Sequence, residues 1–302
     1  MAISPSSSSF QHQFRSISLP CRLHPQTAKI EAELAKLKTW QSSLDSSTVP
    51  TSGETIRTGL DGLAELYSRV QELIDNPTTQ QAFIQRQKGV LVEEALEGSI
   101  ALLDVCNMAQ DLLVMMKQNL QDLQSVLRRK GARLNIERNI SAYNSLKKKV
   151  KKESVKCLGA LKKMESQIKS CSLFDMNCNL SHVIRVLGEV RIVTIFVLQS
   201  LFQFLSVPDP RTRSGGWSLI KKLVVTRPRE HRVVNEIGSV DDALQSLQEC
   251  IRNNMSEIDV LQTTRRRLET LGNNMEELET RLDCVYRTLI RNRVSLLSIL
   301  AQ

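Results

Sequence analysis

The sequence of 302 residues is poor in glycine, proline and aromatic residues, with 12 Gly, 8 Pro and only 4% Phe, Trp and Tyr. An all-β domain needs turn residues and aromatic strand residues in larger numbers, so this class is excluded. With 41% apolar residues, the chain can nevertheless bury a substantial core. The composition predicts an all-α protein and excludes disorder of the whole chain.

Histidine is also scarce, with four residues in the chain. His12 and His24 fall in a Ser-rich amino-terminal stretch and His231 in a basic one, so His182 alone is placed to enter a core. A nucleophile, a base and an orienting group cannot be assembled from these, and neither a Gly-rich phosphate loop nor a G-x-S-x-G elbow occurs. We therefore expect no catalytic residues, no cofactor and no enzymatic activity.

Seven cysteines are spread thinly along the chain, which has no secretory hydrophobic region. An odd number at such spacing is typical of free thiols in a reducing compartment. Cys178 and His182 have the spacing C-x3-H, with Cys171 seven residues earlier, but no C-x2-C pair completes a zinc set. We expect buried thiols and no metal site.

Apolar residues recur at helical spacing along most of the chain. Ser52 is placed to cap one helix, and Thr78 or Thr79 to cap a long one that passes Gly89 and Gly98. The pattern predicts helices near residues 27–45, 52–76 and 78–127, a basic helix over 128–169, and a strongly apolar helix over 183–207.

Residues 183–207 need a separate test because their composition resembles a membrane span. Arg185, Glu189 and Arg191 interrupt the stretch. The remaining run is shorter than the roughly 20 apolar residues that a bilayer requires. We expect no transmembrane span here, but a helix whose apolar face forms the centre of the core.

These boundaries divide the chain into four parts. Residues 1–25, rich in Ser, cannot bury enough apolar surface to offset their ordering entropy, so we expect a disordered arm. Residues 26–206 form the main helical bundle. Residues 207–238 are a linker with a short amphipathic helix, and residues 239–302 form helices that pack on the bundle.

The last part repeats leucine at heptad spacing from Leu247 to Leu296, with Asn254 as the polar exception. The companion apolar positions change phase near Gly272–Asn274, which predicts a coiled-coil discontinuity or a hairpin turn there. The predicted fold is an elongated bundle of six to eight helices, with a C-terminal coiled coil or helical hairpin and a disordered N-terminal arm.

The net charge of +9 is concentrated in one segment. Residues 128–169 hold fourteen Lys and Arg against three acids, an excess of eleven positive charges, so the rest of the chain carries about −2. The densest part of this segment is a cluster of five lysines: Lys147, Lys148, Lys149, Lys151 and Lys152.

The lysine cluster has three interpretations. It is a solvated helix face, a nuclear import signal, or a patch for phosphate groups on anionic lipid or nucleic acid. No aromatic residues alternate with the lysines to stack on bases, so nucleic acid is the least favoured partner and would bind only through salt-sensitive attraction.

The amino-terminal arm carries a second motif. Residues 15–20 have the pattern R-S-x-S-x-P, in which Ser18 is a candidate phosphorylation site for binding by 14-3-3 proteins. Phosphorylation there would add charge and strong acceptors that an Arg cluster can bind. The same acid-poor arm is similar to a chloroplast transit peptide, and both interpretations stay open.

Five ordered blocks carry a resemblance to a known family. They are Phe14–Pro25 (FRSISLPCRLHP), Leu102–Cys106 (LLDVC), Leu123–Lys130 (LQSVLRRK), Tyr143–Glu153 with its lysines, and Leu289–Leu300 (LIRNRVSLLSIL). Over almost the whole chain they resemble the Bypass-like family of land plants. The resemblance implies a plant-restricted helical protein without an established activity, associated with root and shoot development and sometimes with the chloroplast.

The resemblance offers no catalytic residues to carry over. It also weighs against a disposable transit peptide, because RSISLPCRLHP looks like part of the family's own signature. We expect a non-enzymatic adaptor of plant root and shoot development in the cytoplasm or at a membrane periphery. Helix pairing would bind other proteins, and the basic helix would bind acidic partners or a membrane surface. The alternative is a nuclear regulatory factor with the lysine cluster as its import signal.

Overall fold

The computed structural model describes residues 25–46, 50–85, 90–129, 133–170, 179–206, 235–253 and 258–301. In these ranges it contains eight α-helices and no strand, which confirms the all-α prediction for them. The helices are α1 Pro25–Ser46, α2 Gly53–Ile74, α3 Pro77–Gln85, α4 Val90–Arg128, α5 Arg133–Ser170, α6 Asn179–Leu205, α7 Glu236–Arg252 and α8 Ile258–Leu300. Most of the predicted arm, including Ser18, and most of the predicted linker lie outside the described residues.

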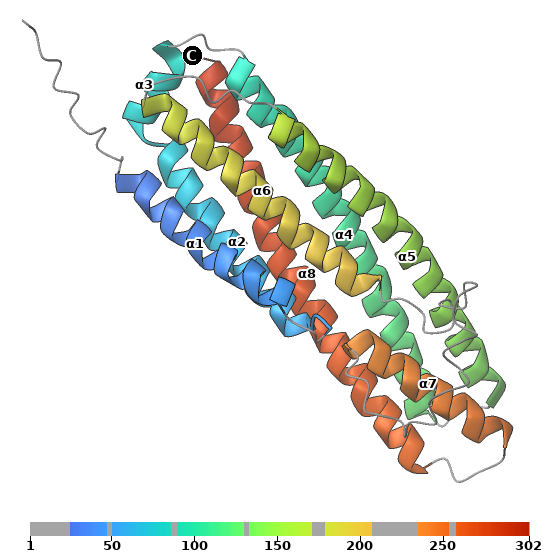
Figure 1. The fold of residues 1–302 in the computed structure, drawn as a ribbon. Coiled ribbons are helices and arrows are strands. Elements are labelled where there is room, and N and C mark those ends of the chain that lie inside the picture. The colour runs from blue at the N-terminus through green and yellow to red at the C-terminus, as the bar shows by residue number, and fades with distance from the viewer. Residues whose placement is uncertain are drawn as a thin grey trace, which may run out of the picture.

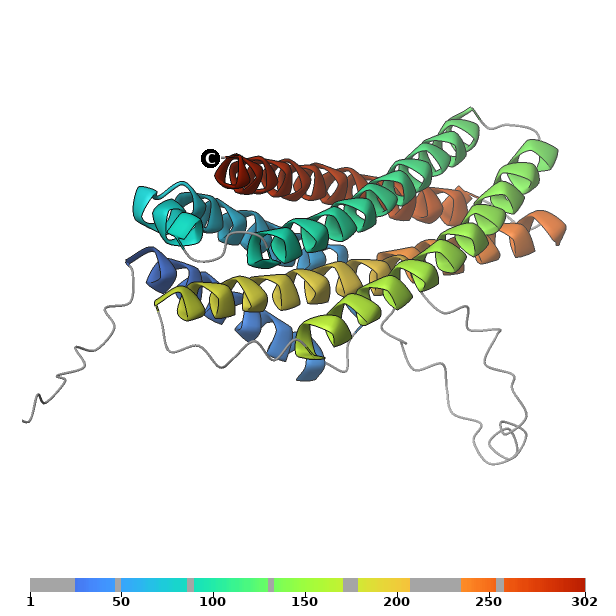
Figure 2. The same cartoon turned by 90° about the horizontal axis from the view of Figure 1, so that it is seen from above.

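The long helices run roughly side by side and give the molecule an elongated shape (Figure 1). α8 lies along α2 and α4, and its amino-terminal half also packs against α7. On the other side of α2, α6 packs against α1, α2 and α5 (Figure 2). The predicted elongated bundle is therefore confirmed, with α5 at its edge.

α2 shows how the apolar pattern positions a helix in this bundle. Six of its apolar side chains at helical spacing are at most 3% exposed: Ile56, Leu60, Leu63, Leu66, Val70 and Leu73. Burying one such side chain contributes about 1.5–3 kcal/mol. Ser52 caps the helix as predicted, since its Oγ accepts a hydrogen bond from the Thr55 amide at 3.2 Å.

Gly59 lets α1 approach α2 closely. A Cβ at this position would lie 2.5 Å from the Trp40 ring, far inside van der Waals contact. The same indole donates from Nε1 to the Thr55 carbonyl at 3.1 Å and meets the Phe196 ring edge to face at 5.9 Å. Trp40 thus joins α1, α2 and α6, and glycine on α2 makes room for it.

The single long helix predicted over 78–127 is instead two helices, α3 and α4, whose axes point in different directions (Figure 1). α3 begins at Pro77, a residue suited to the first helical position, and not at a threonine cap. The Asn76 side-chain oxygen accepts from the Thr78 amide at 2.9 Å. The cap of this helix is therefore Asn76, and not Thr78 or Thr79.

α6 contains the strongly apolar stretch, and its core prediction is confirmed over residues 186–205. Val186, Val190, Val197, Leu201 and Phe202 are each at most 3% exposed. By length and composition alone, the 185–205 part of α6 and the 96–128 part of α4 are long and apolar enough to cross a membrane. Buried core helices pass the same test, and both segments pack against neighbouring helices here.

The C-terminal hairpin is present, but the alternative that placed its turn near Gly272–Asn274 is wrong. α8 continues without a break through Gly272–Asn274, whereas α7 ends at Arg252 and α8 begins at Ile258. The two helices fold onto each other, with Arg267 donating to the Ser239 carbonyl at 2.8 Å. The phase change therefore arises because the heptad positions come from two helices.

Asn235 fixes the start of α7. Its side-chain oxygen accepts from the Gly238 amide at 3.0 Å, so the helix begins at Glu236, three residues before the predicted start. Its side-chain nitrogen lies 3.5 Å from the Phe204 carbonyl oxygen near the end of α6. The end of α6 and the start of α7 are thus adjacent, although 28 residues, 207–234, separate the described parts of the chain.

Candidate functional site

The basic helix α5 lies at the edge of the bundle and packs against α4, α6 and α7. Its inner face carries eight buried side chains: Ile136, Ile140, Tyr143, Val150, Ser154, Cys157, Leu161 and Met164. Leu134, in the first turn of α5, is 78% exposed. The outer face of α5 is covered by no other described helix, so its side chains meet solvent along the length of the helix.

The charges of α5 are sorted between its two sides. Every exposed charged residue on α5 is positive, and these residues are Arg133, Arg138, Lys148, Lys149, Lys152, Lys156, Lys162 and Lys163. The three acids of the helix, Glu137, Glu153 and Glu165, are all half-buried. Glu153 offsets Lys156, which contacts it at 2.9 Å. The outer face of α5 is therefore a surface of one sign, which we call the α5 basic face, defined by the eight residues above.

The structure divides the five lysines of the predicted patch. Lys148, Lys149 and Lys152 are exposed on the α5 basic face, whereas Lys147 and Lys151 are half-buried. Lys162 and Lys163 extend the face by further turns, since positions 148, 152 and 163 project from the same side of a helix. The three exposed lysines of the cluster are thus only part of the exposed patch. Helical periodicity in the sequence indicates Lys162 and Lys163 as further members.

Lys147 belongs to the interior contact between α5 and α7. Its ammonium group pairs with Asp241, and each side chain is only 22% exposed. The same ammonium lies 6.0 Å from the centre of the Tyr143 ring, whose hydroxyl donates to Asp241 at 3.2 Å. Lys147 therefore has a carboxylate partner on another helix, and it belongs to the contact between α5 and α7.

Burial governs the electrostatics of this contact. Removal from water raises the pKa of Asp241, and Lys147 and Tyr143 offset part of that rise. Burial also raises the pKa of Tyr143 well above its usual value, with the Asp241 charge acting in the same direction. The pair joins two helices at a site where a charge without its partner would be costly.

The centre of the α5 basic face is lined by small residues. Ser141, Ser145 and Gly159 are exposed between the charged residues of the face, and a Cβ at Gly159 would meet no atom within 4 Å. Val155 is the exposed apolar side chain among them, at 58%. From Arg138 to Lys163 the face extends about 37 Å at 1.5 Å per residue.

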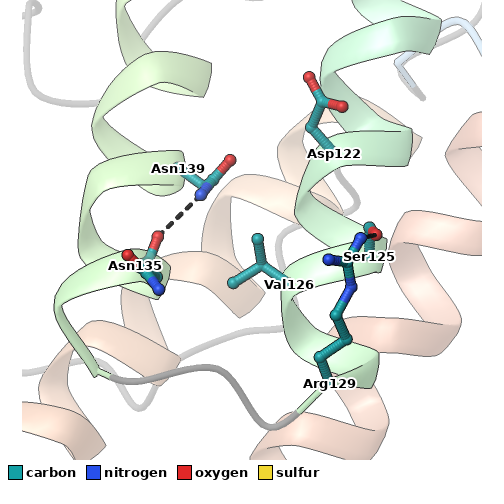
Figure 3. Close-up of a pocket in the computed structure, with 6 residues that line it drawn as sticks. All are labelled: Asp122, Ser125, Val126, Arg129, Asn135 and Asn139. Atoms are coloured by element: carbon teal, nitrogen blue, oxygen red, sulfur yellow. Dashed lines mark hydrogen bonds between the residues drawn. The ribbon is translucent and has the colours of Figure 1, made fainter.

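A pocket of ≈ 260 Å³ lies between the end of α4 and the start of α5 (Figure 3). Its lining residues are Asp122, Ser125, Val126, Arg129, Asn135 and Asn139. Arg129 donates to Ser125 at 2.7 Å, and Asn139 donates to the Asn135 carbonyl at 2.8 Å. The polar groups drawn together here are thus engaged with their own helices, and the pocket brings no nucleophile next to a base.

The remaining candidate residues are possible metal ligands and free thiols. In the described part of the chain, no group of three or more His, Cys, Asp or Glu side chains could hold a metal ion. Cys171, Cys178 and the side chain of His182, weighed above for zinc, lie outside the described residues. Cys106 and Cys157 are buried free thiols, and burial raises the pKa of Cys106 to about 12.

Comparison with known proteins identifies one relationship. A family model described as Protein BPS1, which represents the Bypass-like plant family, matches residues 59–299. The match includes α5, α7 and α8 up to residue 299. No curated protein and no solved structure matches the chain.

Proposed function

This chain belongs to the BPS1 family of plant development proteins, and from that premise we propose that it is a non-enzymatic interaction protein whose α5 basic face binds anionic partners. The observation that carries the proposal is the sorting of charge on α5, where the exposed charged residues are all positive. Fields from several like charges on one surface add, and they attract oppositely charged partners.

The rest of the fold supports this role by holding α5 rigid and outward. Its inner face is anchored in the core through Tyr143, Val150 and Leu161, each at most 1% exposed. The Lys147–Asp241 pair adds a link to α7. An interaction surface on a fixed helix loses little conformational entropy on binding, because its backbone is already ordered.

A charge-matched pair of variants tests the proposal. The α5 variant carries Lys148→Gln, Lys152→Gln and Lys163→Gln, all on the α5 basic face. The control variant carries Lys36→Gln, Arg287→Gln and Arg291→Gln, which remove the same charge from exposed sites on α1 and α8.

The first measurement is the salt concentration that elutes each full-length protein from phosphocellulose. We expect the wild-type and control proteins to elute together and the α5 variant to elute at clearly lower salt. Elution of both variants at the same salt would show that net charge alone, and not the α5 basic face, determines binding.

The developmental role is tested in plants in which the gene for this chain is disrupted and root or shoot growth is altered. The wild-type and control genes should restore growth, and the α5 variant should not. Full restoration by the α5 variant would remove the basic face from the function of the protein in development.

We further propose a cytoplasmic or membrane-peripheral location. A carboxy-terminal fluorophore fusion of each variant, and of a chain lacking residues 1–25, tests it. A nuclear signal that is lost in the α5 variant would favour the import alternative, and a plastid signal lost with the arm would favour the transit peptide. Binding of 14-3-3 proteins at phosphorylated Ser18 stays a prediction, tested by pull-down with the full chain and its Ser18→Ala variant.

A further inference from the structure

We infer that the partner of the α5 basic face is an anionic membrane surface, on which α5 lies with its axis parallel to the bilayer. This inference rests on the proposed function, because it requires that the face binds anionic partners. It adds the identity of the partner, a lipid surface, and the orientation of the bundle on that surface.

The charged groups on this face suit a diffuse negative surface. Six of its eight residues are lysine and two are arginine. The lysine ammonium is a compact point charge on a flexible stem, whereas arginine is favoured where a single carboxylate or phosphate is bound in bidentate geometry. The composition of the face therefore favours many loose contacts with headgroups over a few directed contacts with a peptide.

The shape of the face points in the same direction. From Arg138 to Lys163 the positive side chains are distributed along about 37 Å of one helix, so a flat surface can approach all of them together. Ser141, Ser145 and Gly159 are small, so they leave room for a flat surface near the charged groups. Val155, 58% exposed on this line, is placed to enter the boundary between headgroups and acyl chains.

Nucleic acid fits this surface less well. Proteins that bind single strands stack bases on exposed aromatic side chains. The aromatic residue of α5 is Tyr143, which is fully buried and bonded to Asp241. A nucleic acid would thus find phosphate contacts here but no platform for its bases, so we treat it as an outcome to be tested.

The experiment is co-sedimentation of the full chain with vesicles of phosphatidylcholine alone or with about 30% phosphatidylserine, at about 0.1 M salt. We expect binding to the anionic vesicles only. Each lysine near such a surface changes the binding constant roughly five-fold, so the α5 variant should bind about 100-fold more weakly. The control variant should bind within about two-fold of wild type, and far-UV circular dichroism verifies that all three proteins are folded.

Three outcomes would overturn the inference. Equal binding to neutral vesicles would show that charge does not drive the association. Protein that stays on the vesicles at about 1 M salt would indicate insertion of an apolar helix and not electrostatic docking. Salt-sensitive binding to polyglutamate or duplex DNA, without binding to anionic vesicles, would overturn the membrane partner but leave the proposed anionic binding intact. If the two variants also elute together from phosphocellulose, the proposed function itself fails.

Discussion

Replacing Lys147 should destabilise the protein, although the same replacement at its neighbour Lys148 should not. Both residues belong to one lysine run, but Lys147 pairs with Asp241 inside the α5–α7 contact and Lys148 is exposed. Breaking a fully buried pair from one side costs about 3–5 kcal/mol. Because these two side chains retain 22% exposure, we expect about 1–3 kcal/mol for Lys147→Gln. Lys148→Gln should change the free energy of unfolding by less than about 0.5 kcal/mol.

Two measurements detect the loss of stability in Lys147→Gln. Thermal unfolding by circular dichroism should show a melting temperature about 2–12 °C lower for Lys147→Gln, at roughly 2–4 °C per kcal/mol. Hydrogen exchange should localise the effect, since α7 is the helix that Lys147 holds against α5. Amides of α7 should exchange faster in Lys147→Gln and at the wild-type rate in Lys148→Gln.

The effect should also depend on pH. The pKa of Asp241 in the folded protein lies above its unfolded value, which is about 3.9. Ionisation of this buried carboxyl therefore opposes folding, and stability is lost as pH rises through the folded pKa. Loss of Lys147 raises that pKa further, so the deficit relative to wild type should be largest near neutral pH and shrink toward pH ~4.

Equal melting temperatures for Lys147→Gln and Lys148→Gln would refute this account of the pair. So would a deficit that stays constant with pH, because it would not involve Asp241 ionisation. The double variant Lys147→Gln with Asp241→Asn provides the internal check. It should be less destabilised than the sum of the two single variants, because each single variant leaves one charge without its partner and the double variant leaves none.

Two further predictions follow from the packing. Gly59→Ala should lower the free energy of unfolding by about 1–3 kcal/mol, because the rigid Trp40 ring lies 2.5 Å from the new Cβ. Gly159→Ala, in open space on an exposed helix face, should raise it by about 0.5–1 kcal/mol. Denaturant unfolding measures both variants, and the opposite ranking would contradict the structure. In the native protein, the exposed Cys284 should be alkylated readily, whereas Cys106 should stay unlabelled. Burial raises the pKa of Cys106 to about 12, and the thiolate is the reactive form. Mass spectrometry of the labelled peptides measures both sites, and fast labelling of Cys106 would show that α4 opens.

Much of the bundle follows from local signals in the sequence. The Ser52 cap and the leucine spacing of α2 predict where that helix starts and which side is buried, and both are confirmed. The hairpin was misplaced because Leu247 and Leu261 keep heptad spacing across the turn between α7 and α8. A periodicity that continues by coincidence hides a turn, and only the packing of α7 on α8 reveals it.

The basic helix α5 illustrates a second limit of prediction from sequence. Its charge excess is plain from composition, and helical spacing predicts which lysines share a face. The pairing of Lys147 with Asp241 joins positions 94 residues apart, so no local pattern could indicate it. Nor could the sequence show that all three acids of α5 are half-buried, because that depends on which neighbours cover the helix.

The adjacency of Asn235 and the Phe204 carbonyl has a practical consequence. Among the described residues, this contact requires that the end of α6 and the start of α7 stay next to each other, and doubling the length of chain that closes such a gap costs only about 0.6 kcal/mol. Insertion of a fluorescent protein or an epitope between them should leave the helices undisturbed. The chain thus offers an internal attachment point for a reporter that leaves its amino-terminal arm, its α5 surface and its carboxy-terminal helix unmodified.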